Sequence, residues 1–277
     1  MVAPNPGIVR EDVARALRED EATSDLTAGL VPEQSARATI LCRQQAVLCG
    51  IPWAAEVFHQ LEPSIALEWQ AEDGDQVEAD TVVCKLQGPG RALLQGERTA
   101  LNFLQFLSAT ASRTRQFAQA LDSAPCMLLD TRKTLPGLRH AQKYAVRCGG
   151  GVAHRSSLAE AVLIKENHWA LLPDLEAAIR EARGQHPDTQ VIVEVENLEQ
   201  LERVRTARPD VILLDNFSPE QARSAAAKCP DIPLEISGGV TESNLADYAT
   251  AGAARISLGT LTKDIQAVDF SMRLEHA

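Results

Sequence analysis

Apolar residues in the first third of the chain follow two different spacings. One helical face near the N-terminus carries the apolar residues Val9, Val13, Ala16 and Leu17. The segments 38–48 and 67–86 instead alternate between apolar and polar residues in short runs, with a turn signal at 73–75. Together these spacings predict a small α+β unit that contains an antiparallel sheet.

A long helix is predicted after these strands. Its expected apolar face is formed by Ala100, Leu104, Leu107 and Ala111. We expect the helix to start near Glu97, directly after Gly96, because an acidic side chain suits the positive end of a helix. It should continue to about Ala120 and connect the two halves of the chain.

From Pro125 onward the pattern repeats as strand, loop and helix. The expected strands are 127–130, 161–165, 191–195, 211–215, 234–237 and 254–258. The clearest helices between them are 173–183, 198–207, 219–227 and 242–251. Repeated βα units predict a parallel sheet, either an incomplete barrel or an open, doubly wound sheet. No GxGxxG motif follows a strand, which disfavours the dinucleotide-binding form of the open sheet.

Composition and targeting signals place the chain among ordinary globular proteins. It has 277 residues, of which 45% are hydrophobic and 23% charged. No apolar run approaches the roughly 20 residues that span a bilayer, and the first ten residues lack a secretion signal. We therefore expect a cytoplasmic protein that does not enter a membrane. The cysteine spacing fits no zinc or redox motif, so we expect reduced thiols at Cys42, Cys49, Cys84, Cys126, Cys148 and Cys229.

Positive charge is concentrated in one segment of an otherwise acidic chain. The net charge of −11 argues against nucleic-acid binding. Between residues 132 and 165, however, a single acid, Glu160, accompanies seven basic residues: Arg132, Lys133, Arg139, Lys143, Arg147, Arg155 and Lys165. Glycines and strand-like apolar runs separate these basic residues. This arrangement predicts a bound small anion rather than a solvated basic surface.

Polar residues follow each of the first five predicted strands. They are Asp130 with Arg132 and Lys133, Lys165 with Asn167, Glu194 with Glu196, Asp215 with Asn216, and Ser237. In a βα barrel the C-terminal ends of the strands form the active site. Five polar strand ends that carry both signs of charge favour a catalytic site over five separate helix caps.

The last two strands end in glycine-containing loops that suit a phosphate. Ser237-Gly238-Gly239 is followed twenty residues later by Ser257-Leu258-Gly259. Glycine allows the backbone to approach an anion closely, and barrels commonly hold phosphate at these two loops.

Carboxylates beside such loops suit magnesium, which binds through one or two of them together with substrate phosphates. Glu194 and Asp215 lie at neighbouring predicted strand ends. Glu194 and Glu196 share one face of their strand, so the pattern leaves open which of the two contacts substrate.

A second glycine-rich segment precedes a pair of basic residues. Gly149, Gly150 and Gly151 come before His154 and Arg155. The glycines permit a tight backbone approach, and the planar arginine fork matches a carboxylate in bidentate fashion. We therefore expect this segment to belong to the site.

Several ordered motifs resemble those of the quinolinate phosphoribosyltransferase family. They are GERTALN at 96–102, DTRKT at 130–134, GGG through His154-Arg155, LIKENH at 163–168, LLDNF at 213–217, and Glu19-Asp20 followed by Asp25-Leu26-Thr27. The resemblance covers residues 9–273, nearly the whole chain. It implies an N-terminal α+β sandwich domain with its linking helix (1–112), an incomplete seven-stranded parallel α/β barrel (113–277), and a homodimer.

The resemblance also implies roles for individual residues. Those expected around the carboxylates of quinolinate are Arg132, His154, Arg155, Lys165 and, donated across the dimer interface, Arg98. Those expected at phosphoribosyl pyrophosphate are Lys133, Glu194, Asp215, Ser237, Gly238, Gly239 and Gly259, to which the loop pattern adds Ser257. Glu194 and Asp215 would hold Mg²⁺, and the catalytic set would be Lys133, Lys165, Glu194 and Asp215. The implied reaction gives nicotinate mononucleotide, pyrophosphate and carbon dioxide.

Four positions depart from the family pattern, and three other functions compete. Ser24, Ala153, Ser157 and Glu160 stand where the family usually has glycine, asparagine, glycine and aspartate, which bears on loop geometry rather than on the reaction. The alternatives are a nicotinate phosphoribosyltransferase of related fold, an aldolase that uses Lys165 as a Schiff base, and a non-catalytic phosphosugar-binding module. The density of cations favours a substrate with two carboxylates.

Overall fold

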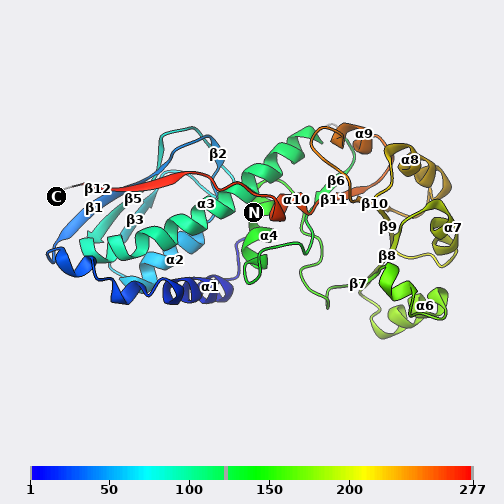
Figure 1. Cartoon of the computed structure of the whole chain (residues 1–277), viewed down its shortest axis with the longest axis horizontal. Coiled ribbons are helices and arrows are strands. Elements are labelled where there is room, and N and C mark those ends of the chain that lie inside the picture. Colours follow the sequence, from blue (N-terminus) through cyan, green and yellow to red (C-terminus); the bar gives the residue numbers. More distant parts are fainter. Residues whose placement is uncertain (1, 122–123, 276–277) are drawn as a thin grey trace. The chain divides into compact units, whose positions relative to one another are not determined.

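The computed structural model describes residues 2–121 and 124–275 (Figure 1). The chain divides into two compact units. The first unit consists of Met1–Arg115, Thr134–Gly150 and Leu261–Ala277, and the second of Gln116–Lys133 and Gly151–Thr260. The chain first passes from one unit to the other after Arg115, close to the domain boundary expected after residue 112.

The first unit contains the predicted antiparallel sheet. Its strand order is β12-β1-β5-β3, formed by β1 (Ser35–Cys42), β3 (Ala66–Trp69), β5 (Thr81–Pro89) and β12 (Phe270–Glu275). A separate two-stranded ladder joins β2 (Ala46–Val47) to β4 (Gln76–Val77). Side chains of β1 alternate between buried and more exposed, because one face of the sheet packs on the core. Strand β12 at the C-terminus was not predicted.

Helices of the first unit pack beside this sheet (Figure 1). The predicted N-terminal helix is α1 (Pro6–Glu19). It contacts α2 (Ile51–Leu61), a helix that was not predicted. Two short 3₁₀ turns, η1 (Ala22–Ser24) and η2 (Ala28–Leu30), follow α1. Trp53 and Phe58 of α2 are fully buried in the shared hydrophobic core.

The long helix α3 (Gly90–Ala120) begins earlier than predicted. Gly96 lies inside this helix and not before it. A Cβ atom at this position would lie 2.7 Å from the ring of Phe58, so glycine permits close packing of α3 against α2. The expectation of a start at Glu97 was therefore wrong, because Gly96 serves helix packing rather than helix termination.

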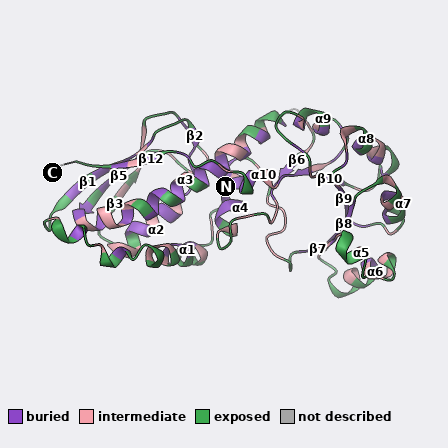
Figure 2. Cartoon of the chain, viewed as in Figure 1, coloured by how far each residue is buried: buried purple, intermediate pink, exposed green. Residues whose placement is uncertain are grey.

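The second unit contains the predicted parallel sheet, whose order is β6-β11-β10-β9-β8-β7. The strands are β6 (Met127–Leu129), β7 (Ala161–Ile164), β8 (Gln190–Val195), β9 (Val211–Asp215), β10 (Leu234–Ser237) and β11 (Arg255–Ser257). Figure 2 shows the central strands as almost wholly buried. In the described residues this sheet has six strands, while Val152 adds an isolated parallel bridge to Leu129.

Helices follow the strands of this sheet, as the periodicity predicted. They are α5 (Glu166–Trp169), α6 (Leu175–Gln185), α7 (Leu198–Thr206), α8 (Pro219–Lys228) and α9 (Leu245–Ala249). Side-chain caps fix where α6, α7 and α8 begin, since Asp174, Asn197 and Ser218 each accept a backbone N–H of the first turn. The short helix α10 (Thr260–Lys263) comes after β11.

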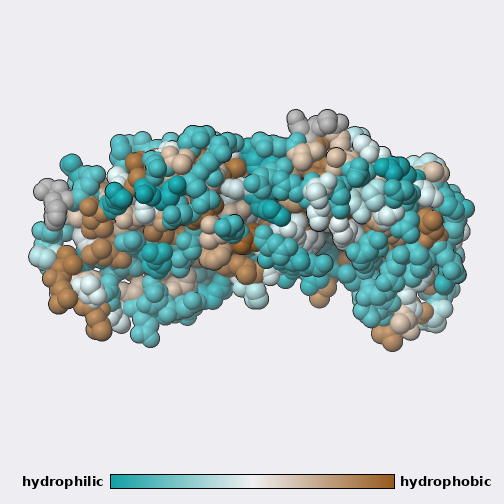
Figure 3. Space-filling view, turned by 45° about the horizontal axis from the view of Figure 1, so that its top comes forward, coloured by the Kyte–Doolittle hydropathy of each residue, from teal (hydrophilic) through white to brown (hydrophobic). Residues whose placement is uncertain are grey.

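The surface is mainly polar. In the view of Figure 3, apolar side chains form small separate groups on a hydrophilic background. The most exposed large apolar residues are Leu26, Leu171, Leu30, Val2 and Leu158. Among the described helices, none combines the length and the apolar character needed to cross a membrane.

Candidate functional site

Three predicted site residues form a row across neighbouring strands of the second unit. Ser237 at the end of β10 pairs in register with Asp215 at the end of β9 and with Ser257 at the end of β11. The C-terminal ends of β9, β10 and β11 therefore present a carboxylate and two hydroxyl side chains at one edge of the sheet. This is the edge at which parallel α/β proteins bind ligands.

A lysine and a carboxylate meet at the adjacent strand ends. Lys165, which directly follows β7, places Nζ 3.0 Å from Oε2 of Glu194 on β8. Glu194 is buried, and desolvation raises the pKa of its carboxyl, while Lys165 opposes that rise. Negative charge on Asp215 raises the Glu194 pKa further, which shows that the two predicted magnesium ligands influence each other.

Burial also raises the pKa of the Asp215 carboxyl. Lys165 and Lys133 oppose this rise, so both lysines lie close enough to act on Asp215. Glu196, in contrast, is exposed at the start of α7, where its backbone N–H donates to Gln200. Of the two glutamates, Glu194 is buried and paired with a lysine, while the exposed Glu196 contacts the helix start and its charge also raises the pKa of Asp215.

Glycines are required in both predicted phosphate loops. Gly238 has a φ of +78°, and a Cβ atom there would lie 2.3 Å from Oδ1 of Asn216. At Gly259 a Cβ atom would lie 2.8 Å from Cδ of Lys133. The aliphatic part of Lys133 thus packs directly on the Gly259 loop. This contact brings a cation to the loop that was expected to hold phosphate.

Two arginines approach each other near these lysines. Desolvation lowers the pKa of Arg155, and the positive charge of Arg132 lowers it further, while Glu194 raises it. One arm of the Arg155 guanidinium donates from Nη1 to the carbonyl of Ala161, 3.0 Å away. A separate cavity of about 200 Å³ beside Arg155 and His154 is lined by Ala161, Gln190 and Arg255, the first residues of β7, β8 and β11, so it lies away from the C-terminal strand ends. The predicted cations Arg132, Lys133, Arg155 and Lys165 are therefore gathered in one unit around two carboxylates.

His154 contacts two buried acids. Its Nε2 lies 3.3 Å from Oε1 of Glu235, and its backbone N–H donates to Oδ1 of Asp130 at 2.8 Å. Arg255 Nη1 lies 4.0 Å from Oε2 of Glu235. Neither Glu235 nor Arg255 was predicted as a site residue. The available signal was a charged residue inside each of two otherwise apolar strands, at positions that pair in register.

Part of the basic segment lies elsewhere. Arg139, Lys143 and Arg147 belong to helix α4 (Arg139–Cys148) in the first unit, although strand-like runs were expected there. The helix forms because apolar residues recur at helical spacing, which buries Ala141, Tyr144 and Ala145 in the core of that unit. Three of the seven basic residues therefore belong to the first unit and four to the second. Arg98 is exposed on α3, also in the first unit.

Comparisons with known proteins assign the family. The N-terminal domain model of quinolinate phosphoribosyl transferase matches residues 22–108, and the C-terminal domain model matches residues 110–273. The chain belongs to the quinolinate phosphoribosyltransferase family. Its expected fold class, an N-terminal α+β domain followed by a parallel α/β domain, is thereby confirmed, although the parallel sheet has six strands in the described residues where seven were expected.

Sequence relatives match almost the whole length of this chain. A probable carboxylating nicotinate-nucleotide pyrophosphorylase of Bacillus subtilis is 38% identical, over 92% of this chain and 89% of that protein. The human protein named nicotinate-nucleotide pyrophosphorylase [carboxylating] is 35% identical over 90% of this chain and 84% of its own length.

Solved structures agree with this assignment. The nicotinate-nucleotide pyrophosphorylase of Francisella tularensis superposes with a TM-score of 0.93, at 39% identity over 99% of this chain and 98% of that one. Human nicotinic acid phosphoribosyltransferase, at 14% identity, shares the fold with a TM-score of 0.61. The family resemblance read from the motifs is confirmed, and the nicotinate alternative is related in fold alone.

Proposed function

We propose that this chain transfers phosphoribose from phosphoribosyl pyrophosphate to quinolinate and removes one carboxylate. The products are nicotinate mononucleotide, pyrophosphate and carbon dioxide. The observation that carries the proposal is the association of four cations with the buried Glu194 and the half-buried Asp215 in one parallel-sheet unit, beside two glycine loops. The carboxylating activity named for the relatives supports it.

Binding of quinolinate is assigned to three of these cations. Arg132, Arg155 and Lys165 would replace the water around the two adjacent carboxylates, as a preorganised site must. Burial lowers the pKa of Arg155 and the charge of Arg132 lowers it further, so the two arginines repel each other. A dianion would relieve this repulsion, which supports a substrate with two carboxylates.

Phosphoribosyl pyrophosphate is assigned to the strand-end row and the glycine loops. Lys133 on Gly259, together with Ser237, Ser257 and the backbone at Gly238 and Gly239, would contact its phosphates. Glu194 and Asp215 fit a magnesium ion, because both carboxyls are held at raised pKa and a divalent cation would relieve their burial and mutual repulsion. Magnesium, when bound, would neutralise charge on the departing pyrophosphate.

The chemical steps require positioning and electrostatics rather than a covalent intermediate with the protein. The pyridine nitrogen forms a bond to the ribose carbon, and the bond from that carbon to pyrophosphate breaks with its electron pair. Positive charge develops on the sugar, close to Glu194 and Asp215. The ring nitrogen is then quaternary, so the bond to the 2-carboxylate can break, releasing carbon dioxide and leaving electrons that a proton takes up.

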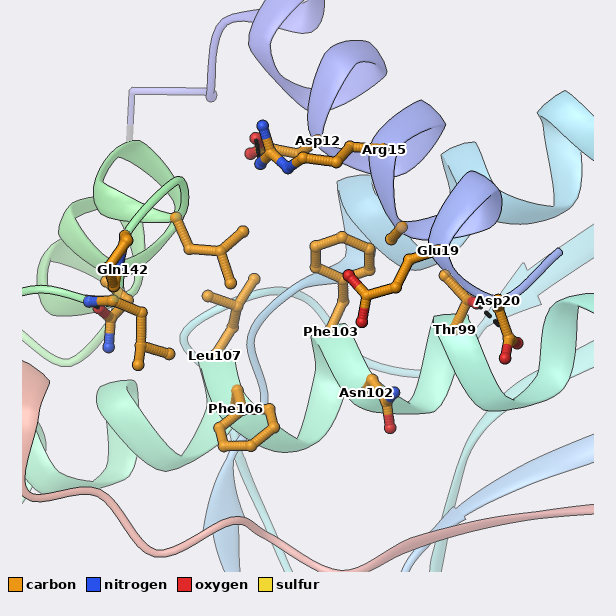
Figure 4. Close-up of a pocket in the computed structure, with 14 residues that line it drawn as sticks. Asp12, Arg15, Glu19, Asp20, Thr99, Asn102, Phe103, Phe106, Leu107 and Gln142 are labelled. Atoms are coloured by element: carbon orange, nitrogen blue, oxygen red, sulfur yellow. Dashed lines mark hydrogen bonds and ion pairs between the residues drawn. The ribbon is translucent and has the colours of Figure 1, made fainter. Parts of the chain in front are cut away.

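A homodimer with Arg98 donated to the partner is part of this proposal. Arg98, Asn102 and Phe106 recur every four residues on α3 and are all exposed, which places them on one helix face. Asn102 and Phe106 line a hollow of about 380 Å³ that α1 closes with acidic side chains, including Glu19 and Asp20 (Figure 4). An exposed arginine and aromatic beside a hollow suit a protein interface.

The reaction is tested by incubating the protein with quinolinate, phosphoribosyl pyrophosphate and Mg²⁺. Formation of nicotinate mononucleotide with one equivalent each of pyrophosphate and carbon dioxide is expected, and nicotinate should not replace quinolinate. Turnover of nicotinate at an equal rate would reject the assignment.

The shared site has a separate test. Mixing inactive Arg98→Ala with inactive Lys165→Met should restore activity in mixed dimers, because one of the two sites then contains both intact residues. Failure of an Arg98→Ala variant to lose activity would remove Arg98 from the site.

The six free cysteines support the expected cytoplasmic location.

A further inference from the structure

Glu235 is a fully buried carboxylate within an otherwise apolar strand. It occupies the second position of β10 and shares a strand face with Ser237, two residues later. Removing a carboxylate from water costs several kcal/mol unless other charges and hydrogen bonds compensate. Its neighbours are therefore informative about why an acid stands here.

Two side chains approach the carboxylate of Glu235 from different directions. His154 Nε2 lies 3.3 Å from Oε1, and Arg255 Nη1 lies 4.0 Å from Oε2; neither oxygen has a hydrogen-bond partner in the described part of the chain, so both contacts are electrostatic. Arg255 also donates from Nη1 to Gln190, 3.2 Å away. Arg255 is a permanent cation, so it balances the charge of Glu235 whether or not His154 is protonated.

The other ring nitrogen of His154 is engaged as an acceptor. The backbone N–H of Arg155 donates to Nδ1 at 2.7 Å. A nitrogen that accepts a hydrogen bond carries no hydrogen, so this contact leaves the ring hydrogen to Nε2, the nitrogen that faces Glu235. Asp130 accepts the backbone N–H of His154 itself, which fixes the main chain on the other side.

We propose that Glu235 is a positioning residue that holds His154 as the Nε2–H ring and, through Nδ1, fixes the backbone that presents Arg155 to quinolinate. The chain of contacts runs from a buried acid to a histidine, and from the histidine to the backbone of the arginine. The role for quinolinate rests on the proposed function.

The first test observes the ring directly in the unliganded protein. With histidine labelled with ¹⁵N, the chemical shifts of the two ring nitrogens of His154 report which one carries hydrogen. The expected result is hydrogen on Nε2 and an unprotonated Nδ1. Hydrogen on Nδ1 in the wild-type protein overturns the proposal. This measurement needs no turnover, so it can fail while quinolinate activity is intact, and succeed if that activity is absent.

The second test separates positioning from general stability by two substitutions. Glu235→Leu removes the carboxylate that faces Nε2 and should raise the KM for quinolinate by about 10- to 100-fold, the usual effect of removing a group that orients a functional histidine. The KM for phosphoribosyl pyrophosphate should change little. Glu235→Gln keeps an acceptor oxygen, so it should retain the Nε2–H ring and a quinolinate KM within about threefold of wild type, although its Tm falls.

A matched control addresses packing. Leu213 pairs in register with Glu235 on β9 and is buried, but its side chain is apolar. Leu213→Val should lower Tm without a comparable rise in quinolinate KM. A purely structural role for Glu235 predicts instead that KM follows Tm across all three variants, and that result would overturn the proposal. If Glu235→Leu does not fold, the wild-type spectrum and the Glu235→Gln kinetics still decide.

Discussion

Replacing Lys165 by methionine tests the central ion pair of the site. The substitution keeps a side chain of similar length and removes the charge that lies 3.0 Å from Glu194. Glu194 then remains buried without its nearest cation. Breaking a fully buried pair costs about 3–5 kcal/mol. The Lys165 side chain is 45% exposed, so solvent screening reduces the expected loss in unfolding free energy to about 1–3 kcal/mol.

The substitution should impair catalysis more than it impairs stability. Lys165 is assigned to a carboxylate of quinolinate, and a charge-assisted hydrogen bond contributes about 1.5–3 kcal/mol. Glu194 also loses its partner in this variant. We therefore expect kcat/KM for quinolinate to fall by about 10²- to 10³-fold. Because Lys165 lowers the pKa of Glu194, its loss should also move the acidic limb of the pH profile to higher pH.

Lys228 offers a matched control on the same unit. Its side chain is 41% exposed and pairs with Glu202, which is 37% exposed and not buried like Glu194. Lys228→Met should therefore cost less than about 1 kcal/mol and leave kinetics unchanged. Steady-state kinetics with urea unfolding of both variants decides the question. If Lys165→Met keeps kcat/KM within threefold of wild type, the assignment of Lys165 to the substrate is wrong.

Three further predictions concern the loops, the pH dependence and the metal. Gly238→Ala should lower the unfolding free energy by about 2 kcal/mol, because of its positive φ and the contact with Asn216, and should raise the KM for phosphoribosyl pyrophosphate; the control Gly184→Ala, with open space around it, should be neutral or stabilising in thermal melts. The folded protein binds a proton at Asp215 more tightly than the unfolded chain, so this group's contribution to stability falls as pH rises from the unfolded towards the folded pKa; Asp215→Asn should flatten that part of the urea-unfolding profile, and an unchanged slope would contradict the raised pKa. Chelation with EDTA should abolish turnover and added Mg²⁺ should restore it, while Glu194→Gln should require more Mg²⁺ for half-maximal rate; full activity in EDTA would exclude the metal.

The parallel unit was the most predictable part of the fold. Its strands are buried on both faces, so they read as short continuous apolar runs, and all six expected strands are present within a residue or so. Helix α2 and strand β12 escaped prediction because neither carries a strong periodic signal of its own. The start of α3 was misplaced because Gly96 reads locally as a helix boundary, whereas its packing against Phe58 depends on a distant part of the chain.

Site residues were predictable where their position at a strand end carried the signal. Lys165, Asp215 and Ser237 each follow an apolar run, and parallel topology places such residues at one edge. The sequence does not separate Glu194 from Glu196, since both read as one strand face; the structure shows that they differ in burial. Glu235 was hidden for a different reason. A charge within a strand signals a partner, but the sequence does not identify His154 as that partner.

Like charges in the ligand-free site provide a physical basis for choosing quinolinate over nicotinate. Arg132 and desolvation both disfavour the charged form of Arg155, and burial disfavours the charged forms of Glu194 and Asp215. The fold holds these groups together at a cost in stability, as functional sites commonly do. A ligand with two adjacent carboxylates offsets the repulsion between the cations more fully than a ligand with one, and so gains more binding energy from the same residues. Selectivity then follows from the charge that the protein leaves uncompensated.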